Sequence, residues 1–241
     1  MLTAYTDNDG KEYKYYDEYK DESGDLVIIT SDDLAIKVQK SLLEHSSPVF
    51  RSMFSTCKSD DNVIHLDHPA AALALYLTAL GDRPLDYLNN EYDTFAEAIE
   101  LCFLYDTLHT GPKMLKTLSP IGKLGHKHGY SLFKFSARFD DVLTACRIIQ
   151  TIGLYQDTRL NGGDAFWRPN NWERSYMDVL PSSWVWAYMQ AHQQTTARIR
   201  TRDYWNDIAI KFLEYLLPVG VLTWHELQTF YRGNPLETKL T

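Results

Sequence analysis

Hydrophobic and polar residues near the start of the chain follow the pattern of two adjacent strands. Residues 25–30 (DLVIIT) form a nearly continuous β-branched run, and residues 34–39 (LAIKVQ) place Leu34, Ile36 and Val38 on one face. A short Ser-Asp-Asp turn separates the runs, so the pattern predicts a β-hairpin. Because the first run has no polar face, we expect that strand to be buried on both sides.

The next stretch, LLEHSSPVFRSMF, predicts two short helices with a restart between them. Residues 41–45 suit one short helix. Ser47 is a favourable N-cap, and Pro48 suits the first helical position, where its missing N–H removes no hydrogen bond. The apolar residues that follow recur at helical spacing, at Val49, Phe50, Met53 and Phe54.

A third strand and two longer helices complete the first half of the chain. VIHL, residues 63–66, predicts a strand, and Pro69 opens an almost entirely apolar helix that Gly81 ends. A further helix is expected to begin at Thr94, with Glu97 completing a capping box. Gly111-Pro112 is a strong stop signal.

The second half of the chain is helical in pattern and contains all six tryptophans. Between its helices lies a long segment, residues 154–180, rich in Gly, Asn and Trp. We expect it to be irregular and packed through its aromatic residues, and a loop of that length is either functional or poorly ordered. The expected helices span about residues 112–128, 131–137, 140–152, 182–199, 203–217 and 223–231.

Together these patterns predict an α+β fold with three parts. Residues 23–110 would form a helical cluster flanked by a small β-sheet, and residues 111–241 an all-α region. Residues 1–22 form an acidic, tyrosine-rich arm, for which we expect a mobile or loosely docked tail. A tyrosine-based docking segment is the alternative.

Composition narrows the classes of partner. The net charge of −8 disfavours nucleic acid as the main ligand, because phosphate binding needs a basic surface. The three cysteines have no metal-ligand spacing and suit reduced thiols, which favours the cytoplasm or nucleus. The N-terminus lacks the pattern of a signal peptide, and no run reaches the roughly 18 apolar residues of a membrane span.

The N-terminal element order resembles the BTB/POZ domain family over residues 23–108. The stretches that carry the resemblance are Gly24–Ile29, Ile36–Leu43, Ser46–Phe54, Asp67–Leu77 and Ala98–Thr107. The chain departs from the family pattern at Gln39, where a histidine is usual, at Ala72, where an aromatic is usual, and at Leu80-Gly81-Asp82. It therefore looks like a divergent member. Leu180-Pro181 and Trp205–Ala209 resemble motifs in tails of BTB proteins from mushroom-type fungi.

The resemblance implies a non-enzymatic protein-interaction module that homodimerises and recruits a protein partner, as an adaptor or transcription-linked scaffold. The family places its dimer seam on the first helix, which here holds Leu42, Leu43 and His45. Asp25 and Lys40 match a charged pocket in the dimer groove of transcription-factor members. An ion pair that only stabilises the hairpin is the alternative for these two residues.

A cullin-type ubiquitin ligase is a second partner that the resemblance allows. Cullin-binding members often carry a hydrophobic-x-Glu motif in the loop after the second short helix. The corresponding loop here has no clear version of it, although Cys57, Asp60 and Asp61 remain candidate partner-binding residues. Trp184 and Trp186 cannot share one helix face, so we expect one in the core and one as a surface anchor.

The sequence offers no strong catalytic, cofactor or metal motif. His65 with His68, and His126 with His128, would need to converge to bind a metal, and we expect none. Phosphate-binding glycine loops and the nucleophile motifs of hydrolases are also missing from the sequence. The alternative of another class is an enzyme whose unrecognised site lies in the helical region.

Overall fold

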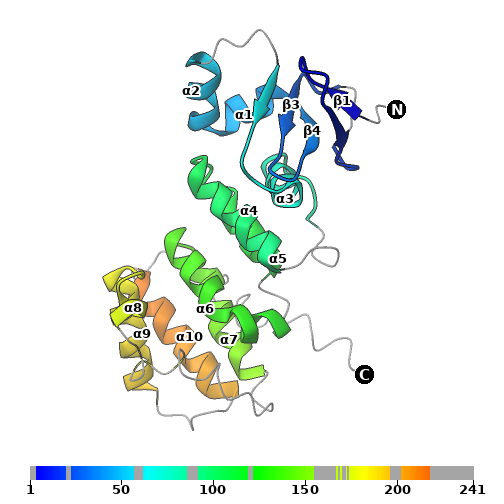
Figure 1. Ribbon diagram of the computed structural model, residues 1–241. Coiled ribbons are helices and arrows are strands. Elements are labelled where there is room, and N and C mark those ends of the chain that lie inside the picture. The colour runs from blue at the N-terminus through cyan, green and yellow to red at the C-terminus, as the bar shows by residue number, and fades with distance from the viewer. Residues whose placement is uncertain are drawn as a thin grey trace. The chain divides into compact units, whose positions relative to one another are not determined.

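The computed structural model describes residues 4–19, 23–56, 62–85, 92–118, 122–154, 174–195 and 202–217, together with Trp167, Pro169 and Trp172. The chain divides into two compact units, Met1–Ile121 and Gly122–Thr241 (Figure 1). The first unit combines a five-stranded mixed sheet with helices, and the described part of the second is helical, which makes the fold α+β.

The sheet of the first unit has the strand order β1-β2-β4-β3-β5. Strand β3 (Leu26–Ile29) is buried along its whole length and pairs antiparallel with β4 (Leu34–Val38), with Ile28 opposite Ile36. Strand β5 (Val63–His65) pairs parallel with β3 on its other side. The predicted hairpin, its doubly buried first strand and the third strand are all confirmed.

The expectation of a loosely attached N-terminal tail is wrong for residues 4–19. Strands β1 (Ala4–Thr6) and β2 (Glu12–Tyr15) form an antiparallel hairpin, and β2 pairs parallel with β4. Tyr13 and Tyr19 are buried, and the Tyr19 hydroxyl donates a 3.0 Å hydrogen bond to the Ala74 carbonyl. The sequence pattern did not reveal these strands, because the many acidic residues suggested a tail exposed to solvent. The tyrosine rings between them supply the apolar surface that the strands bury.

The described residues of the first unit form five helices beside this sheet. The two short helices are α1 (Lys40–Ser46) and α2 (Pro48–Thr56), and the apolar helix is α3 (Ala70–Leu80), ended by Gly81 as expected. Helix α4 (Tyr92–Leu104) packs on α3. Because α4 is already helical at Tyr92, Thr94 is not its N-cap and the expected capping box is wrong. Helix α5 (Gly111–Leu118) packs on α4 and belongs to the first unit, so the unit ends after this helix and not before it.

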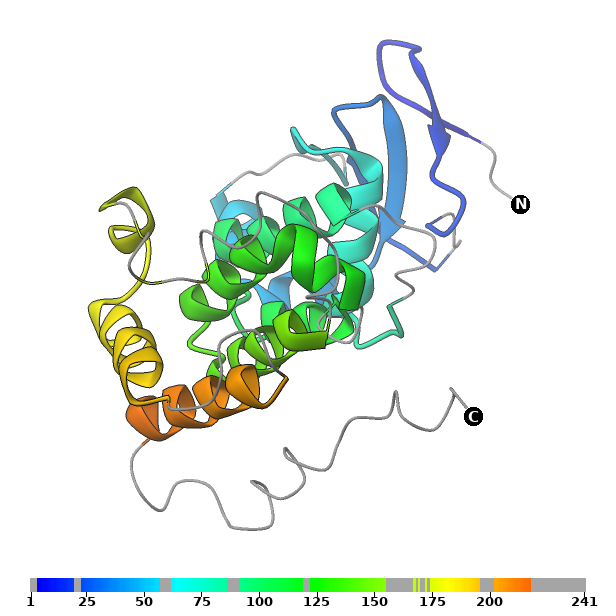
Figure 2. The ribbon, with the colours of Figure 1, turned by 90° about the horizontal axis from the view of Figure 1, so that it is seen from below.

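The second unit contains α6 (Gly122–Arg138), α7 (Val142–Leu154), the short α8 (Arg174–Met177), α9 (Ser182–Gln194) and α10 (Arg202–Leu216). Helix α7 packs on α6 and α10, and α10 also packs on α9 (Figure 2). The helices expected at 140–152 and 203–217 are confirmed within two residues. The helix expected at 182–199 ends earlier, at Gln194, and the one expected at 223–231 lies outside the described residues.

The expected boundaries between residues 112 and 137 are wrong. The helix expected over 112–128 is two helices, and α6 continues through Gly129, where a break was expected. Helix α5 ends at Leu118 and α6 begins at Gly122, and residues 119–121 between them lie outside the described residues. A side chain does not fit at position 129 without a shift of Trp167, because a Cβ there would lie 2.7 Å from Cζ2 of that ring.

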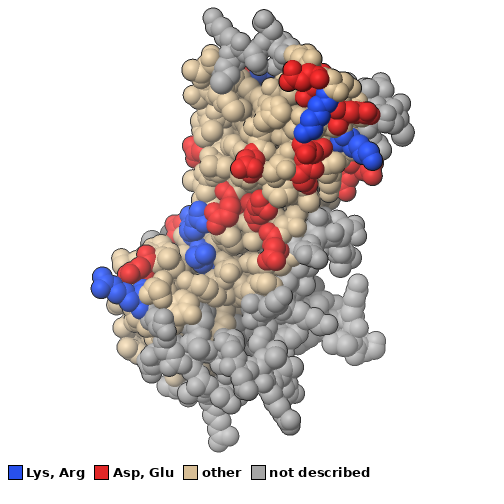
Figure 3. All heavy atoms as spheres, in the orientation of Figure 1, with Lys and Arg blue, Asp and Glu red and all other residues tan. Residues whose placement is uncertain are grey.

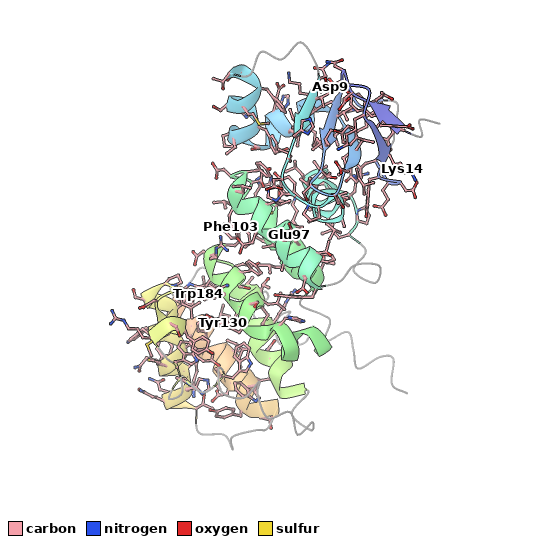
Figure 4. The ribbon with its side chains drawn as sticks, viewed as in Figure 1. Asp9, Lys14, Glu97, Phe103, Tyr130 and Trp184 are labelled. Carbon is pink, nitrogen blue, oxygen red and sulfur yellow. The ribbon has the colours of Figure 1, made fainter. Side chains whose placement is uncertain are left out.

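An aromatic core holds the second unit together. Trp184, labelled in Figure 4, is part of this core. Its ring lies 5.6 Å from Phe133 and 5.4 Å from Phe212, in edge-to-face contacts. Trp167 and Trp172 are buried in the same core, where Trp172 stacks on Tyr188 at 5.0 Å. The described tryptophans of the 154–180 segment thus pack through their aromatic rings, as expected.

Candidate interaction surface on the first two helices

The restart between α1 and α2 is held by a buried serine. The Ser47 hydroxyl accepts a 3.1 Å hydrogen bond from the Phe50 N–H, as an N-cap does. It also donates to the Tyr105 carbonyl at 2.5 Å, just beyond the end of α4. The Phe50 ring stacks on Tyr105 with ring centres 4.3 Å apart. The proline break is therefore anchored to the core, which sets the position of both short helices.

The Asp25 carboxylate contacts the backbone of Lys40 and not its ammonium group. The Lys40 N–H, at the first position of α1, donates a 2.6 Å hydrogen bond to Asp25 Oδ1. The Lys40 ammonium instead lies 4.9 Å from the centre of the Phe54 ring and 4.0 Å from Glu44 Oε1. Asp25 is thus a capping residue of α1, whereas Lys40 covers an aromatic side chain of α2.

An open hollow of about 410 Å³ lies between α1 and α2 and is lined by Glu44, His45, Arg51, Phe54 and Ser55. The Arg51 guanidinium donates to the Glu44 carbonyl at 3.0 Å and to the His45 carbonyl at 3.4 Å. It therefore satisfies carbonyls at the end of α1 and links the two helices. His45 Nδ1 lies 2.7 Å from the Ser41 carbonyl oxygen, which can accept a hydrogen bond from it.

The predicted dimer-seam residues divide into accessible and inaccessible ones. His45 is exposed and Leu42 is half-buried beside Gly81, at the end of α3. Leu43 is completely buried within its own unit, so it is not part of an accessible surface. The assignment of Leu43 as an interface residue is therefore wrong. The sequence showed two adjacent leucines, Leu42 and Leu43, and in the folded unit the second of them packs in the core.

Sequence reasoning grouped Val49 with the apolar residues of α2 and did not identify it as a surface residue, but it is 40% exposed. Phe50 and Phe54 are four residues apart and share the buried side of the helix, with rings 6.0 Å apart. Val49 lies about 100° away from Phe50 around the helix axis, so a helical projection could have separated it from the core residues.

The other partner-binding candidates have different outcomes. Cys57, Asp60 and Asp61 lie outside the described residues. Trp184 is only 2% exposed and its Nε1 donates to Asp140 Oδ1 at 3.3 Å, so it belongs to the core and its assignment to a partner surface is wrong. Trp186 is 53% exposed. One tryptophan in the core and one on the surface is the arrangement that the sequence predicted.

The first unit is acidic, and the two described cysteines are buried. Burial raises the pKa of the Cys102 thiol to about 12 and also raises the pKa of Cys146, so both sulfurs stay protonated. Among the described residues, no group of three or more His, Cys, Asp or Glu side chains is placed to bind a metal. Residues 1–121 carry 21 Asp and Glu against 10 Lys and Arg, and acidic side chains are prominent on the face of this unit in Figure 3.

None of the described helices is long and apolar enough to cross a membrane. Compared with models of protein families and with curated protein sequences, the chain matches none.

Proposed function

We propose that this chain is a BTB/POZ-like protein-interaction module that homodimerises through α1 and α2 and recruits a protein partner as an adaptor or scaffold, without catalysis. Support comes from the element order β3-β4-α1-α2-β5-α3-α4, which is the order in which the sequence resembles that family. The stretch that carries most of the resemblance, Ser46–Phe54, lies at the helix restart and leads into α2.

The observation that carries the proposal is the exposed apolar side chain of Val49. It lies on the helix that also contributes Arg51, Phe54 and Ser55 to the hollow. The neighbouring α1 adds the half-buried Leu42 and the exposed His45. A mixed apolar and charged surface of this kind suits an interface between two copies, in which each copy presents the same residues to the other.

Light scattering on the full chain at micromolar concentrations tests the dimer. Val49→Glu is expected to shift the population towards monomer, because a charge would be buried at the seam. Leu143→Glu is a matched control: Val49 and Leu143 are each the second residue of a helix and are 40% and 38% exposed. Glutamate is tolerated in a first helical turn, so both variants should fold.

Two outcomes would contradict the proposal. One is a wild-type chain that remains monomeric throughout the micromolar range. The other is an equal loss of dimer in both variants, which would place the seam elsewhere. Leu43→Glu is unsuitable for this test, because the side chain is buried and the charge would unfold the first unit.

The cullin-adaptor and enzyme alternatives are not proposed. The adaptor alternative depends on the loop after α2, of which residues 57–61 lie outside the described residues. No observation on the described residues of the helical region favours the enzyme alternative. Direct binding of the chain to the N-terminal domain of a cullin would assign the adaptor role, because that domain is the scaffold surface to which BTB adaptors of this class attach.

A further inference from the structure

Helix α9 contains no Asp, Glu, Lys or Arg, although only one of its sides is buried. At the chain's charged fraction of 23%, a helix of 13 residues would contain about three such residues. Helix α3 is also uncharged, but nine of its 11 residues are buried, whereas only four of the 13 residues of α9 are. A helix without charges is typical of a protein interior. The outer side of α9 therefore has a composition that suits contact with another element.

Trp186 lies at the centre of this outer side and is 53% exposed. Its ring makes an edge-to-face contact with Tyr215 of α10, with ring centres 5.1 Å apart. The residues one helical turn before and after Trp186 are its neighbours on the helix surface. Together with Trp186 they form what we call the α9 outer face: Ser182, Ser183, Met189 and Gln190. The two serines are exposed, and the methionine and the glutamine are half-buried. Tryptophan and methionine are enriched, and most charged residues depleted, at the centres of protein–protein interfaces.

The histidine of α9 adds no charge to the helix at neutral pH. His192 packs against the rings of Tyr188, Tyr204 and Trp205. Burial lowers the pKa of His192 to about 4, so the ring is neutral under physiological conditions. Helix α9 is thus uncharged along its whole length.

The chemistry of the α9 outer face favours a second copy of this chain as its partner. Serine hydroxyls and glutamine amides both donate and accept hydrogen bonds, so each can bond to its own counterpart, which an ionised carboxylate or an ammonium group cannot do. Two tryptophan rings can likewise stack or meet edge to face. Two copies of a chain with a net charge of −8 also repel each other. A face without charges lets them meet with the least contact between like charges.

We propose that the α9 outer face binds the same face of a second copy, around a two-fold axis beside Trp186. In such a contact each copy presents the same residues to the other, so Trp186 meets its own counterpart. Helix α9 is only about 20 Å long, so the contact is small and the association is weaker than that of a standard interface. This seam does not depend on the α1–α2 seam proposed above. A chain that has both seams would assemble beyond the dimer, because each copy could bind two others.

Light scattering on the full chain from micromolar to sub-millimolar concentrations tests this seam. We expect the mass of the wild type to rise above that of a dimer at the upper end of the range, and Trp186→Glu to stop at the dimer. If only the α1–α2 seam were wrong, Val49→Glu would behave like the wild type and Trp186→Glu would remain monomeric. A mass of Trp186→Glu equal to that of the wild type at every concentration would overturn the α9 seam.

Gln190→Glu separates the contact from folding, because it keeps the tryptophan ring and adds a charge one helical turn away from it. The added charges of two copies would repel each other across the seam, so association should weaken and should recover when salt is raised. Leu143→Glu is the matched control, at a 38% exposed position of the same unit, and should leave the mass unchanged. Far-UV circular dichroism checks that the variants are folded. Equal masses for Gln190→Glu and the wild type would contradict the proposal.

Photo-crosslinking identifies the occupant of the face directly. The full chain would carry Trp186→p-benzoylphenylalanine, which keeps an aromatic ring at this position, and would be irradiated as a mixture of unlabelled and ¹⁵N-labelled protein. We expect crosslinks from position 186 to residues 182–194 in mixed-isotope peptides. Crosslinks in single-isotope peptides alone would show that the face is covered by its own chain. That result, or an absence of mixed-isotope crosslinks to α9, would overturn the proposal.

Discussion

The carboxylate of Asp25 accepts a 2.6 Å hydrogen bond from the N–H of Lys40 and so caps helix α1 from outside it. Gln39, the N-cap residue, makes no side-chain cap bond. The β3–β4 hairpin caps α3 in the same way, because Asp32 Oδ1 accepts a 3.0 Å hydrogen bond from the Ala70 N–H. Two aspartates of one hairpin therefore stabilise the positive N-terminal ends of two helices.

Asp25→Ala is expected to destabilise the first unit by about 1 kcal/mol, because the first N–H of α1 loses its acceptor. Asp25→Asn should lose less, since the amide oxygen can still accept the hydrogen bond. Urea unfolding followed by far-UV circular dichroism measures both. Asp9→Ala is the control, because it removes an exposed aspartate from the β1–β2 turn of the same unit (Figure 4). Equal losses at the two positions would contradict the capping role.

Gly24→Ala is expected to be more damaging than Gly81→Ala. A Cβ at Gly24 would lie 2.9 Å from Val38 N and 3.0 Å from Val38 O, and this backbone belongs to the sheet. The strands would have to separate, at a cost of about 1–3 kcal/mol. At Gly81 the closest atom would be 3.4 Å away. A Tm that falls equally in both variants would show that β4 yields to the extra methyl group.

Tyr19→Phe tests whether the N-terminal hairpin is part of the fold. The Tyr19 hydroxyl bonds both the Ala74 carbonyl and the Thr78 hydroxyl of α3, and its removal leaves buried polar groups without that partner. We expect a loss of about 1–2 kcal/mol in chemical unfolding. Tyr16→Phe, at a half-buried tyrosine nearby, should change the stability little. If residues 4–19 were only a tail, neither substitution would alter the unfolding midpoint.

His192 should make the second unit sensitive to acid. It lies among aromatic rings on α9 and α10, and its Nδ1 is hydrogen-bonded to the Tyr204 hydroxyl at 2.8 Å. Among the described residues, its Nε2 is buried without a partner. Burial lowers the pKa of His192 to about 4 from the usual 6.5.

Because the unfolded chain binds this proton more readily, the folded state should lose stability as the pH falls from about 6.5 to about 4. The loss should reach at most about 3 kcal/mol and change little below pH 4. His192→Phe should flatten this part of the stability–pH curve, whereas His45→Gln, at an exposed histidine, should not. Unfolding midpoints of both variants and the wild type across this pH range provide the comparison. Parallel curves for wild type and His192→Phe would refute the assignment.

Local patterns predicted much of the first unit and of its candidate surface. The hairpin, the helix restart and the glycine at the end of α3 follow from residue types within a few positions of one another, so short-range rules sufficed. The N-terminal hairpin was missed because Tyr19 is buried against Ala74 and Thr78, which are more than 50 positions away in the sequence. Likewise, the close approach that leaves no room for a Cβ at Gly129 involves Trp167, from a distant segment.

The sequence by itself determined the helix restart at residues 47–48 and showed that Trp184 and Trp186 cannot share one helix face. Ser47 and Pro48 specify the restart because an N-cap and a first-turn proline act on their own backbone. Only the tertiary structure decided that Leu43 and Trp184 are buried while Leu42 and Trp186 remain accessible. It also decided that Asp25 caps α1 instead of pairing with the Lys40 ammonium. Helical periodicity shows that two neighbouring residues face different directions, but the elements that pack around the helix determine which direction is inward.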